Sequence, residues 1–156
     1  MSGYIMDMRK LVGHRTLIQC AASIIIENEK GQILLGRRSD NHCWAYSGGS
    51  IEIDERVEDC ARRELLEETG LTAGTLELFM INSGPEIHYI YPNGDEVSNV
   101  EIIYICRDWS GEPRSSDGEL TELRFFDVAD IPDEISPPIK PVIDEYIRQR
   151  TLTDQR

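Results

Sequence analysis

The segment 55–69 constrains the fold of this chain more than any other part of the sequence. Gly70 follows it, and glycine is the natural residue to end a helix because it adopts the left-handed conformation at little cost. At the other end, Asp54 is a candidate N-cap, and Glu55 suits the positive end of a helix dipole. We therefore predict a helix over residues 55–69.

Three glutamates of this helix share one side. With Glu64 at zero and about 100° per residue, Glu68 falls near 40° and Glu67 near 300°. Small and apolar residues occupy the same arc: Val57, Cys60 and Ala61. Acids normally lie opposite the apolar stripe, and a carboxylate cluster turned partly inward needs a counter-charge, which Mg²⁺ supplies. The alternative is an ordinary Glu-rich surface helix.

Two adjacent glycines, Gly48 and Gly49, stand in the loop before the helix. Glycine lets the backbone approach a ligand closely and leaves its carbonyl and amide unshielded. An isolated glycine pair more commonly marks a tight turn, so its meaning depends on the glutamates that follow.

The whole segment 49–71 resembles the signature of the Nudix hydrolases. That signature is Gly, five residues, Glu, seven residues, Arg-Glu, an aliphatic residue, any residue, Glu-Glu, any residue, Gly and an aliphatic residue. The chain matches every specified position: Gly49, Glu55, Arg63, Glu64, Leu65, Glu67, Glu68, Gly70 and Leu71. Nine constrained positions at fixed spacing make this a specific signal.

The resemblance implies the Nudix fold, an α+β arrangement in which an α/β/α sandwich contains a mixed β-sheet and a catalytic loop–helix motif. We expect residues 1–156 to form one domain, with 1–13 as a lead-in that is either a short edge strand or a loose tail. The remaining hydrophobic pattern predicts strands over 16–27, 32–37, 76–81, 86–91, 96–106 and 120–126.

Turns and a second helix complete the expected elements. Residues 28–31 form a turn that should join the first two strands as a hairpin, and 92–95 form a second hairpin turn. A short helical turn is expected within 127–135. A second helix should run from Pro137 to about Arg148.

The resemblance also implies roles for the residues of the signature. Glu64 and Glu68 would be the main metal ligands, with Glu67 in support and a backbone carbonyl near Gly48 or Gly49 completing the coordination. Gly49, Glu64, Glu67 and Glu68 are therefore the candidate metal ligands. Ser47 stands where the family often has proline, which changes the loop but removes no ligand.

The candidate catalytic residues are Glu64, Glu67, Arg63 and Glu119. Arg63 would orient a glutamate through an ion pair, and Glu55 would support the loop and helix. Family members commonly use a further glutamate from outside the signature. Glu119 and Glu122 are the two candidates here, and we prefer Glu119; each could instead be a solvent-facing residue.

Three residues are candidates for substrate contact. Arg37, or its neighbour Arg38, ends the second predicted strand near the expected cleft and could meet a phosphate. Trp44 and Tyr46 precede the glycine pair and could stack on a base. A surface position for the arginine and core packing for the two aromatic residues are the alternatives.

The charge balance argues against a nucleic-acid polymer as partner. The chain has 29 acidic and 16 basic residues and a formal net charge of −13, whereas binding to a phosphate backbone needs a basic surface. An acidic chain can still bind a small polyanion if bound cations intervene.

Cysteine spacing and hydropathy indicate a cytoplasmic protein without a membrane segment. The four cysteines have no zinc-binding spacing. The longest aliphatic run, 21–26, is far too short to cross a bilayer.

Together these features predict a hydrolase that depends on Mg²⁺, with Mn²⁺ as a possible substitute, and cleaves a phosphoanhydride bond in a nucleotide-type small molecule. The preferred substrate is a nucleoside triphosphate, giving a monophosphate and pyrophosphate. ADP-ribose, dinucleoside polyphosphates and nucleotide sugars are alternatives. A non-catalytic nucleotide-sensing Nudix-fold domain is an alternative of another class, and the intact glutamates argue against it. A monomer and a homodimer are both compatible with the sequence.

Overall fold

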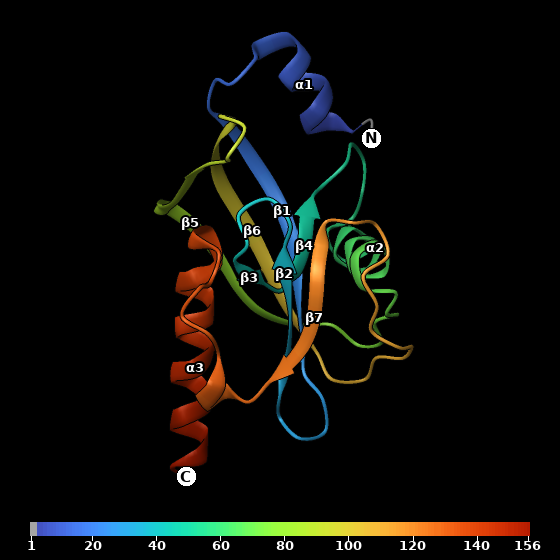
Figure 1. The fold of residues 1–156 in the computed structure, drawn as a ribbon, viewed down its shortest axis with the longest axis vertical. Coiled ribbons are helices and arrows are strands. Elements are labelled where there is room, and N and C mark those ends of the chain that lie inside the picture. The colour runs from blue at the N-terminus through green and yellow to red at the C-terminus, as the bar shows by residue number, and fades with distance from the viewer. Residues whose placement is uncertain (1–2) are drawn as a thin grey trace.

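The structure, a computed structural model, describes residues 3–156 and contains three α-helices and two β-sheets in that range (Figure 1). The α-helices are α1 (Tyr4–Val12), α2 (Val57–Thr69) and α3 (Lys140–Asp154). Two short 3₁₀ turns are η1 (Val128–Asp130) and η2 (Pro137–Ile139). The strands are β1 (Leu17–Ile26), β2 (Ile33–Arg38), β3 (Trp44–Ala45), β4 (Ser47–Ser50), β5 (Glu77–Ile90), β6 (Glu96–Cys106) and β7 (Leu120–Phe126).

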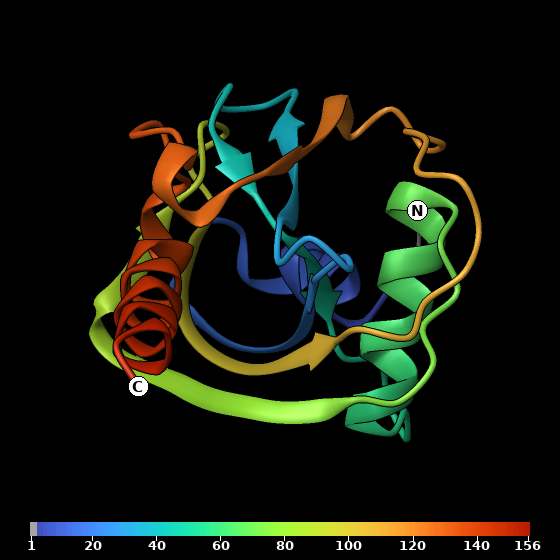
Figure 2. The same ribbon diagram turned by 90° about the horizontal axis from the view of Figure 1, so that it is seen from below.

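The larger sheet is mixed and lies between two helices. Its strand order is β4-β1-β6-β5, with β1 and β6 parallel and the other neighbours antiparallel. The smaller sheet is antiparallel, in the order β3-β2-β7. Viewed from below, α2 and α3 flank the strands on opposite sides (Figure 2). The expected α/β/α layering with a mixed sheet is therefore confirmed.

Side chains of β1 and β6 point alternately to the two faces of the larger sheet, so the apolar core is divided into two clusters. Ile24 and Ile26 pack with Cys60, Ala61 and Leu65 of α2 on one side of the sheet. On the other side, a second cluster forms against α3: Ile25, Ile103, Ile105, Val142, Ile143 and Tyr146. Successive strand residues point to opposite faces, so the nearly continuous aliphatic run of β1 serves both cores.

The N-terminal residues were expected to be an edge strand or a loose tail, and this was wrong. Residues 4–12 form helix α1, which lies at one end of the molecule (Figure 1). Arg9 secures the helix, because the residue is only 8% exposed and its guanidinium donates to the carbonyl oxygens of Gly13, Arg15 and Glu96. These contacts join α1 to the start of β6.

The predicted hairpin of the first two strands was also wrong. The turn forms, since Gly31 donates to the Asn28 carbonyl, but the pairing of the two segments ends at the bridge between Glu27 and Ile33. Beyond it, β1 pairs with β4 and β6, while β2 joins the other sheet. The strand at 120–126 and the turn at 92–95 agree with prediction.

Two element boundaries differ from prediction. Helix α2 begins at Val57 rather than at Glu55, because Asp54 adopts a left-handed φ of 62° and Arg56 occupies the N-cap position. The strands expected at 76–81 and 86–91 form one irregular strand, β5, whose pairing with β6 shifts between Ser83 and His88. The second helix was expected from Pro137; η2 covers 137–139, and α3 starts at Lys140.

Two other findings bear on the expected environment. Within residues 3–156, none of the helices is both long and apolar enough to span a bilayer. All four cysteines carry free thiols: Cys20, Cys43, Cys60 and Cys106.

A buried ionic cluster connects β1 to α3. The Glu27 carboxylate accepts a 2.6 Å hydrogen bond from the Tyr146 hydroxyl and lies 2.9 Å from the Arg150 guanidinium and 3.3 Å from that of Arg107. Burial alone would raise the pKa of Glu27, but Tyr146 and the two arginines outweigh it and lower that pKa. The carboxylate is therefore charged in the folded protein at neutral pH.

Glu27→Gln should lower the free energy of unfolding by about 2 kcal/mol at pH 7, because it removes charge-assisted hydrogen bonds. The folded-state pKa of Glu27 is lowered, so this stabilisation is present above the ordinary glutamate pKa of about 4.3. It is lost as the pH falls through the folded-state pKa. The free energies of unfolding of variant and wild type, measured with urea, should therefore differ less at pH 3 than at pH 7.

Glu77→Gln is the matched control for this variant. Glu77 pairs with the same Arg107, but its side chain is 64% exposed. An exposed pair contributes little, so this variant should stay within about 0.5 kcal/mol of wild type. Equal losses for both variants would contradict the role assigned to Glu27.

Candidate active site

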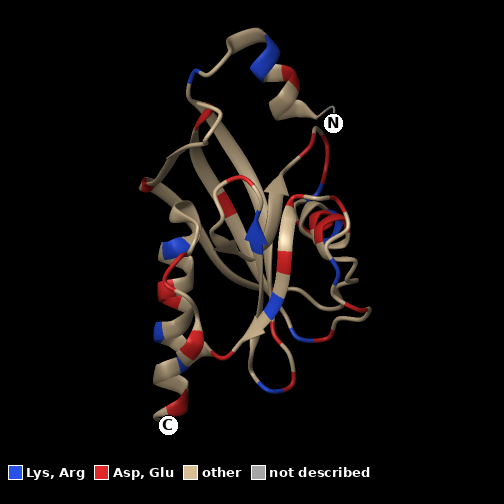
Figure 3. Ribbon diagram, in the orientation of Figure 1, with Lys and Arg blue, Asp and Glu red and all other residues tan. Residues whose placement is uncertain are grey.

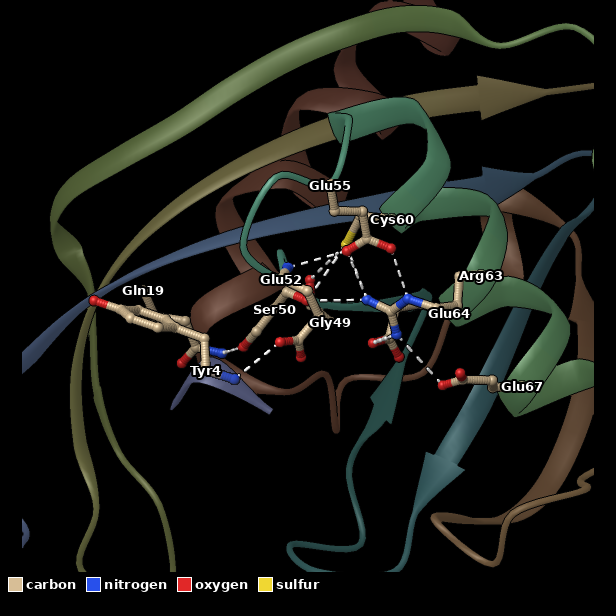
Figure 4. A network of polar contacts seen from close by, with 10 residues as sticks. All are labelled: Tyr4, Gln19, Gly49, Ser50, Glu52, Glu55, Cys60, Arg63, Glu64 and Glu67. Carbon is tan, nitrogen blue, oxygen red and sulfur yellow. Dashed lines mark hydrogen bonds and ion pairs between the residues drawn. The ribbon is translucent and has the colours of Figure 1, made fainter. Parts of the chain in front are cut away.

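Arg63 joins the loop before α2 to the acidic face of the helix (Figure 4). Its guanidinium donates two hydrogen bonds to the Glu55 carboxylate, at 2.7 and 2.9 Å, and a third to Glu64 at 2.8 Å. Glu67 lies 3.5 Å from the same group. The hydrogen bond from Arg63 lowers the pKa of Glu55, with burial opposing it in part. The ion pair expected of Arg63 is therefore present, with both Glu55 and Glu64.

Gly49 lies directly against the Glu64 carboxylate. Strand β4 places it there by pairing with β1, with Gly49 opposite Ala22. A Cβ atom on Gly49 would stand 2.3 Å from Cδ of Glu64. Only glycine leaves room for this approach, so Gly49 and Glu64 form one structural unit.

Glu68 is the most deeply placed acid of the helix. Its side chain is buried at 6% exposure, and within residues 3–156 it makes no hydrogen bond or ion pair. Burial raises its pKa well above the ordinary value; the charges of Glu64 and Glu119 add to this, and Arg38 opposes it. A charged carboxylate so deeply placed is costly without a partner, and a bound cation would offset that cost.

Glu119 approaches these acids from the loop before β7. It lines a cavity of about 480 Å³ together with Glu64, Gly49 and Arg38. Partial burial and the nearby charge of Asp117 raise the pKa of Glu119. Burial likewise raises the pKa of Glu64. The cavity therefore brings signature and non-signature carboxylates together. Figure 3 shows that acidic residues also lie along α2 and in the loop before it.

The other candidate for the extra carboxylate lies elsewhere. Glu122 is on β7 and forms an ion pair with Arg124. It lines neither this cavity nor the smaller pocket beside it. The geometry thus favours Glu119 over Glu122 for a role at the site.

The arginine at the cavity is Arg38, not Arg37. The Arg37 side chain is exposed and donates to the His42 carbonyl. A β-bulge separates the two arginines in the pairing of β2 with β7, and bulges re-aim side chains. Arg38 lines the cavity and holds Asp40 through two hydrogen bonds of 2.8 and 2.7 Å.

The two aromatic candidates have different surroundings. Trp44 is buried in the core beside α3, edge-on to Phe126 with ring centroids 4.9 Å apart, so it is not available to stack on a base. Tyr46 lines a second pocket of about 90 Å³, which adjoins the larger cavity through shared lining residues such as Arg38 and Gly49.

The donor chemistry of the site fits Mg²⁺. Within residues 3–156, no three acidic, histidine or cysteine side chains converge as a complete metal site. Mg²⁺ needs no such preformed cage, because it is commonly held by one or two carboxylates with waters and substrate phosphates. Glu64 and Glu68 lie one turn apart on α2, so their carboxylates offer oxygen ligands of the kind that Mg²⁺ prefers.

Comparison with known proteins decides the family. A profile of the NUDIX domain matches residues 18–146. The chain belongs to the Nudix family. The resemblance drawn from the signature is confirmed, and with it the reaction class of the family, hydrolysis of an anhydride bond.

Several curated relatives are similar over most of this Nudix chain. An ADP-ribose pyrophosphatase of Methanocaldococcus jannaschii is 32% identical over 149 residues, covering 92% of this chain and 83% of the relative. An 8-oxo-dGTP diphosphatase of Haemophilus influenzae is 33% identical over 109 residues, covering 67% and 74%. An oxidized purine nucleoside triphosphate hydrolase of Danio rerio is 32% identical over 115 residues, covering 70% and 67%. Their names give different substrates.

Solved structures agree with the Nudix fold. The MutT NUDIX hydrolase from Burkholderia pseudomallei superposes with a TM-score of 0.70 at 24% identity, covering 82% of this chain and 97% of that one. MutT of Methanosarcina mazei gives a TM-score of 0.66 at 22% identity, covering 87% and 97%. At such identity the likeness concerns the fold alone.

Sequence reasoning missed one wall of the cavity. Helix α1 contributes Ile5, Met6 and Arg9 to it, opposite the acids of α2. A signal was available, since Ile5, Met8 and Val12 recur at helical spacing between Gly3 and Gly13.

Gly49→Ala should lower kcat/KM by about 100-fold while the protein stays folded. The added Cβ would displace the Glu64 carboxylate, and a misplacement of about 1 Å can cost that much. The backbone at Gly49 is outside the left-handed region, so alanine itself is tolerated. Steady-state kinetics alongside circular dichroism measure both properties.

Gly74→Ala is the control for a general packing defect. Its Cβ would meet the Asp108 carbonyl at 2.1 Å, and it does not line the cavity. It should reduce stability and leave kcat/KM of the folded enzyme unchanged. If Gly49→Ala is folded and its kcat/KM equals that of wild type, the assignment of Gly49 and Glu64 as one structural unit is contradicted.

Proposed function

We propose that this Nudix protein is a Mg²⁺-dependent nucleoside triphosphate pyrophosphohydrolase that releases a nucleoside monophosphate and pyrophosphate. The observation that carries the proposal is the cavity of about 480 Å³ where Glu64, Gly49 and Glu119 meet beside unpaired Glu68. A small pocket lined by tyrosines and polar residues adjoins that cavity. This layout suits one phosphate chain with one base.

The residues that would hold Mg²⁺ are Glu64 and Glu68, with Glu67 and the Gly49 carbonyl in support. When bound, Mg²⁺ neutralises phosphate charge and makes water more acidic. Mn²⁺, which also favours oxygen ligands, can take its place. This requirement also accounts for the binding of a polyanion by a chain of net charge −13.

The protein's own side chains supply positioning and proton transfer. Arg38 lines the cavity and places a guanidinium where a phosphate would lie. Arg63 acts indirectly, because it holds the Glu64 carboxylate by a hydrogen bond and does not itself contact the substrate. Glu119 is the proton acceptor: it faces the cavity from the loop before β7, and it takes the proton of the water that attacks phosphorus.

ADP-ribose hydrolysis is the second candidate. The similarity to the ADP-ribose pyrophosphatase of M. jannaschii favours it, because that match covers 92% of this chain. Both reactions break an anhydride bond next to a nucleoside, so the same acids would serve. ADP-ribose has a second ribose in place of the terminal phosphates of a triphosphate. The pocket of about 90 Å³ beside the cavity offers little room for that ribose.

Glu68→Gln should reduce hydrolysis at least about 100-fold, since several kcal/mol of charge stabilisation depend on the metal. Wild type and variant would be assayed with Mg²⁺ or Mn²⁺ on nucleoside triphosphates, ADP-ribose, dinucleoside polyphosphates and nucleotide sugars, with released phosphates quantified. Turnover of triphosphates by wild type alone is expected. Preferential turnover of ADP-ribose would move the assignment to the second candidate, and no metal-dependent turnover would refute both.

Glu119→Gln and Glu122→Gln form a matched pair that tests the proton acceptor. Loss of a general base costs about 10²–10⁴-fold in kcat, so Glu119→Gln should fall in that range. Glu122 pairs with Arg124 outside the cavity, so Glu122→Gln should change kcat by less than about twofold. The reverse order would transfer the role to Glu122.

A further inference from the structure

The face of the larger sheet beneath α3 changes from apolar to polar along β6. Ile105 and Ile103 belong to the core, and the next two residues on the same face are Glu101 and Asn99. On β1, the residues that follow Ile25 on this face are Ser23, Ala21 and Gln19. The polar side chains form the floor of the pocket of about 90 Å³. A core strand has no structural need for such a floor.

Glu101 is the unusual member of this floor. It is 6% exposed and accepts a 2.7 Å hydrogen bond from the Ser23 hydroxyl. The buried Tyr46 hydroxyl faces it, yet has no well-aligned hydrogen-bond partner in residues 3–156. Over the same residues, no lysine, arginine or histidine pairs with Glu101. Burial raises its pKa, with the two hydroxyl groups opposing the shift.

A buried acid of this kind is costly to keep. Replacing unpaired buried polar groups by apolar ones of similar shape is often neutral or stabilising. Hydrogen-bond donors from a ligand would offset the cost, because the carboxylate still has free lone pairs after binding Ser23. The pocket is therefore built to receive N–H groups.

Two tyrosines form an aromatic wall beside this floor. Tyr89 and Tyr91 pack edge to face with centroids 5.0 Å apart, and both are half-buried. Asn41 donates to the Tyr89 hydroxyl at 3.2 Å and so positions that ring. Exposed aromatic faces beside a polar floor suit a planar heterocycle, whose stacking contributes about 1–3 kcal/mol per base.

The pocket is continuous with the cavity of about 480 Å³, which is called the phosphate cavity from here on. They share five lining residues: Gln19, Arg38, Gly48, Gly49 and Tyr91. One ligand can therefore place its phosphates near α2 and its base edge near Glu101. The small volume of the pocket accommodates the edge of one ring and excludes a second nucleoside.

We propose that Glu101 is the base-specificity residue of this site and accepts hydrogen bonds from two adjacent N–H groups of a guanine-type purine. The proposal rests on the proposed function and names its substrate class. Guanine presents N1–H beside its 2-amino group, which matches both carboxylate oxygens. Adenine and cytosine present a ring acceptor beside an amino group, and hypoxanthine lacks the second donor.

Three triphosphates test the proposal on the wild-type enzyme. kcat/KM should fall in the order GTP, ITP, ATP, because each step removes an N–H donor to Glu101. A good bidentate contact gives about 1–3 kcal/mol of discrimination, or roughly 5- to 150-fold. A preference for ATP, or equal values for GTP and ITP, would overturn the assignment.

Glu101→Gln tests the residue itself. Glutamine keeps the shape but offers one acceptor and one donor, so the preference for GTP over ATP should shrink about 10-fold or more. Glu96→Gln is the control, because Glu96 lies on the same strand but lines neither pocket, and it should keep the wild-type ratios. Unchanged ratios in folded Glu101→Gln would refute the role.

A binding measurement separates this proposal from the hydrolytic function. If wild type cleaves no triphosphate, the proposed function fails, but calorimetry with GDP and ADP in the presence of Mg²⁺ still reports on the pocket. Tighter GDP binding by wild type that is lost in Glu101→Gln would support Glu101 as the reader of the base. Equal GDP and ADP binding would overturn it.

Discussion

The ion pairs of Arg63 hold the site in its arrangement. The guanidinium has five N–H donors in a fixed fork, and three of them bind Glu55 and Glu64 at 2.7–2.9 Å. Arg63 is 31% exposed, so these pairs contribute little to overall stability. Their effect is geometric: the loop before α2 is fixed to the helix, and the Glu64 carboxylate is directed against Gly49.

Two buried acids mark the two ends of the substrate path. Glu68, which makes no hydrogen bond or ion pair within residues 3–156, lies one helical turn from Glu64 of the larger cavity, and Glu101 lies on the floor of the adjoining pocket. Neither position stabilises the fold, because an apolar side chain of similar size would avoid the desolvation cost. The fold supports them through the apolar cores on both sides of the larger sheet. In the proposed function, Glu68 helps to hold a cation at one end and Glu101 contacts the base at the other.

Local sequence patterns predicted the catalytic helix, most strands and the layer order, but not the choice of strand partners. The turn at Gly31 formed as expected, yet β1 and β2 joined different sheets because their partners lie far apart in sequence. The same limit applies to Arg37 and Arg38. Alternation along a regular strand assigns one residue to each face, but the β-bulge between them depends on pairing with distant β7.

The site was predictable where spacing alone determines it. Glu64 and Glu68 share a helix face by periodicity, and both were named from the sequence. Glu119 was preferred over Glu122 without a decisive reason, and its place at the cavity follows from the loop before β7. The wall formed by α1 was missed, because a helix of only nine residues gives a short periodic signal, carried by Ile5, Met8 and Val12.

Anomalous diffraction from crystals soaked with Mn²⁺ and a non-hydrolysable nucleoside triphosphate analogue would test the central claim most directly. The account predicts a manganese peak between the carboxylates of Glu64 and Glu68, with phosphate oxygens completing its coordination. A manganese peak away from α2, or analogue bound with no metal at these carboxylates, would contradict it.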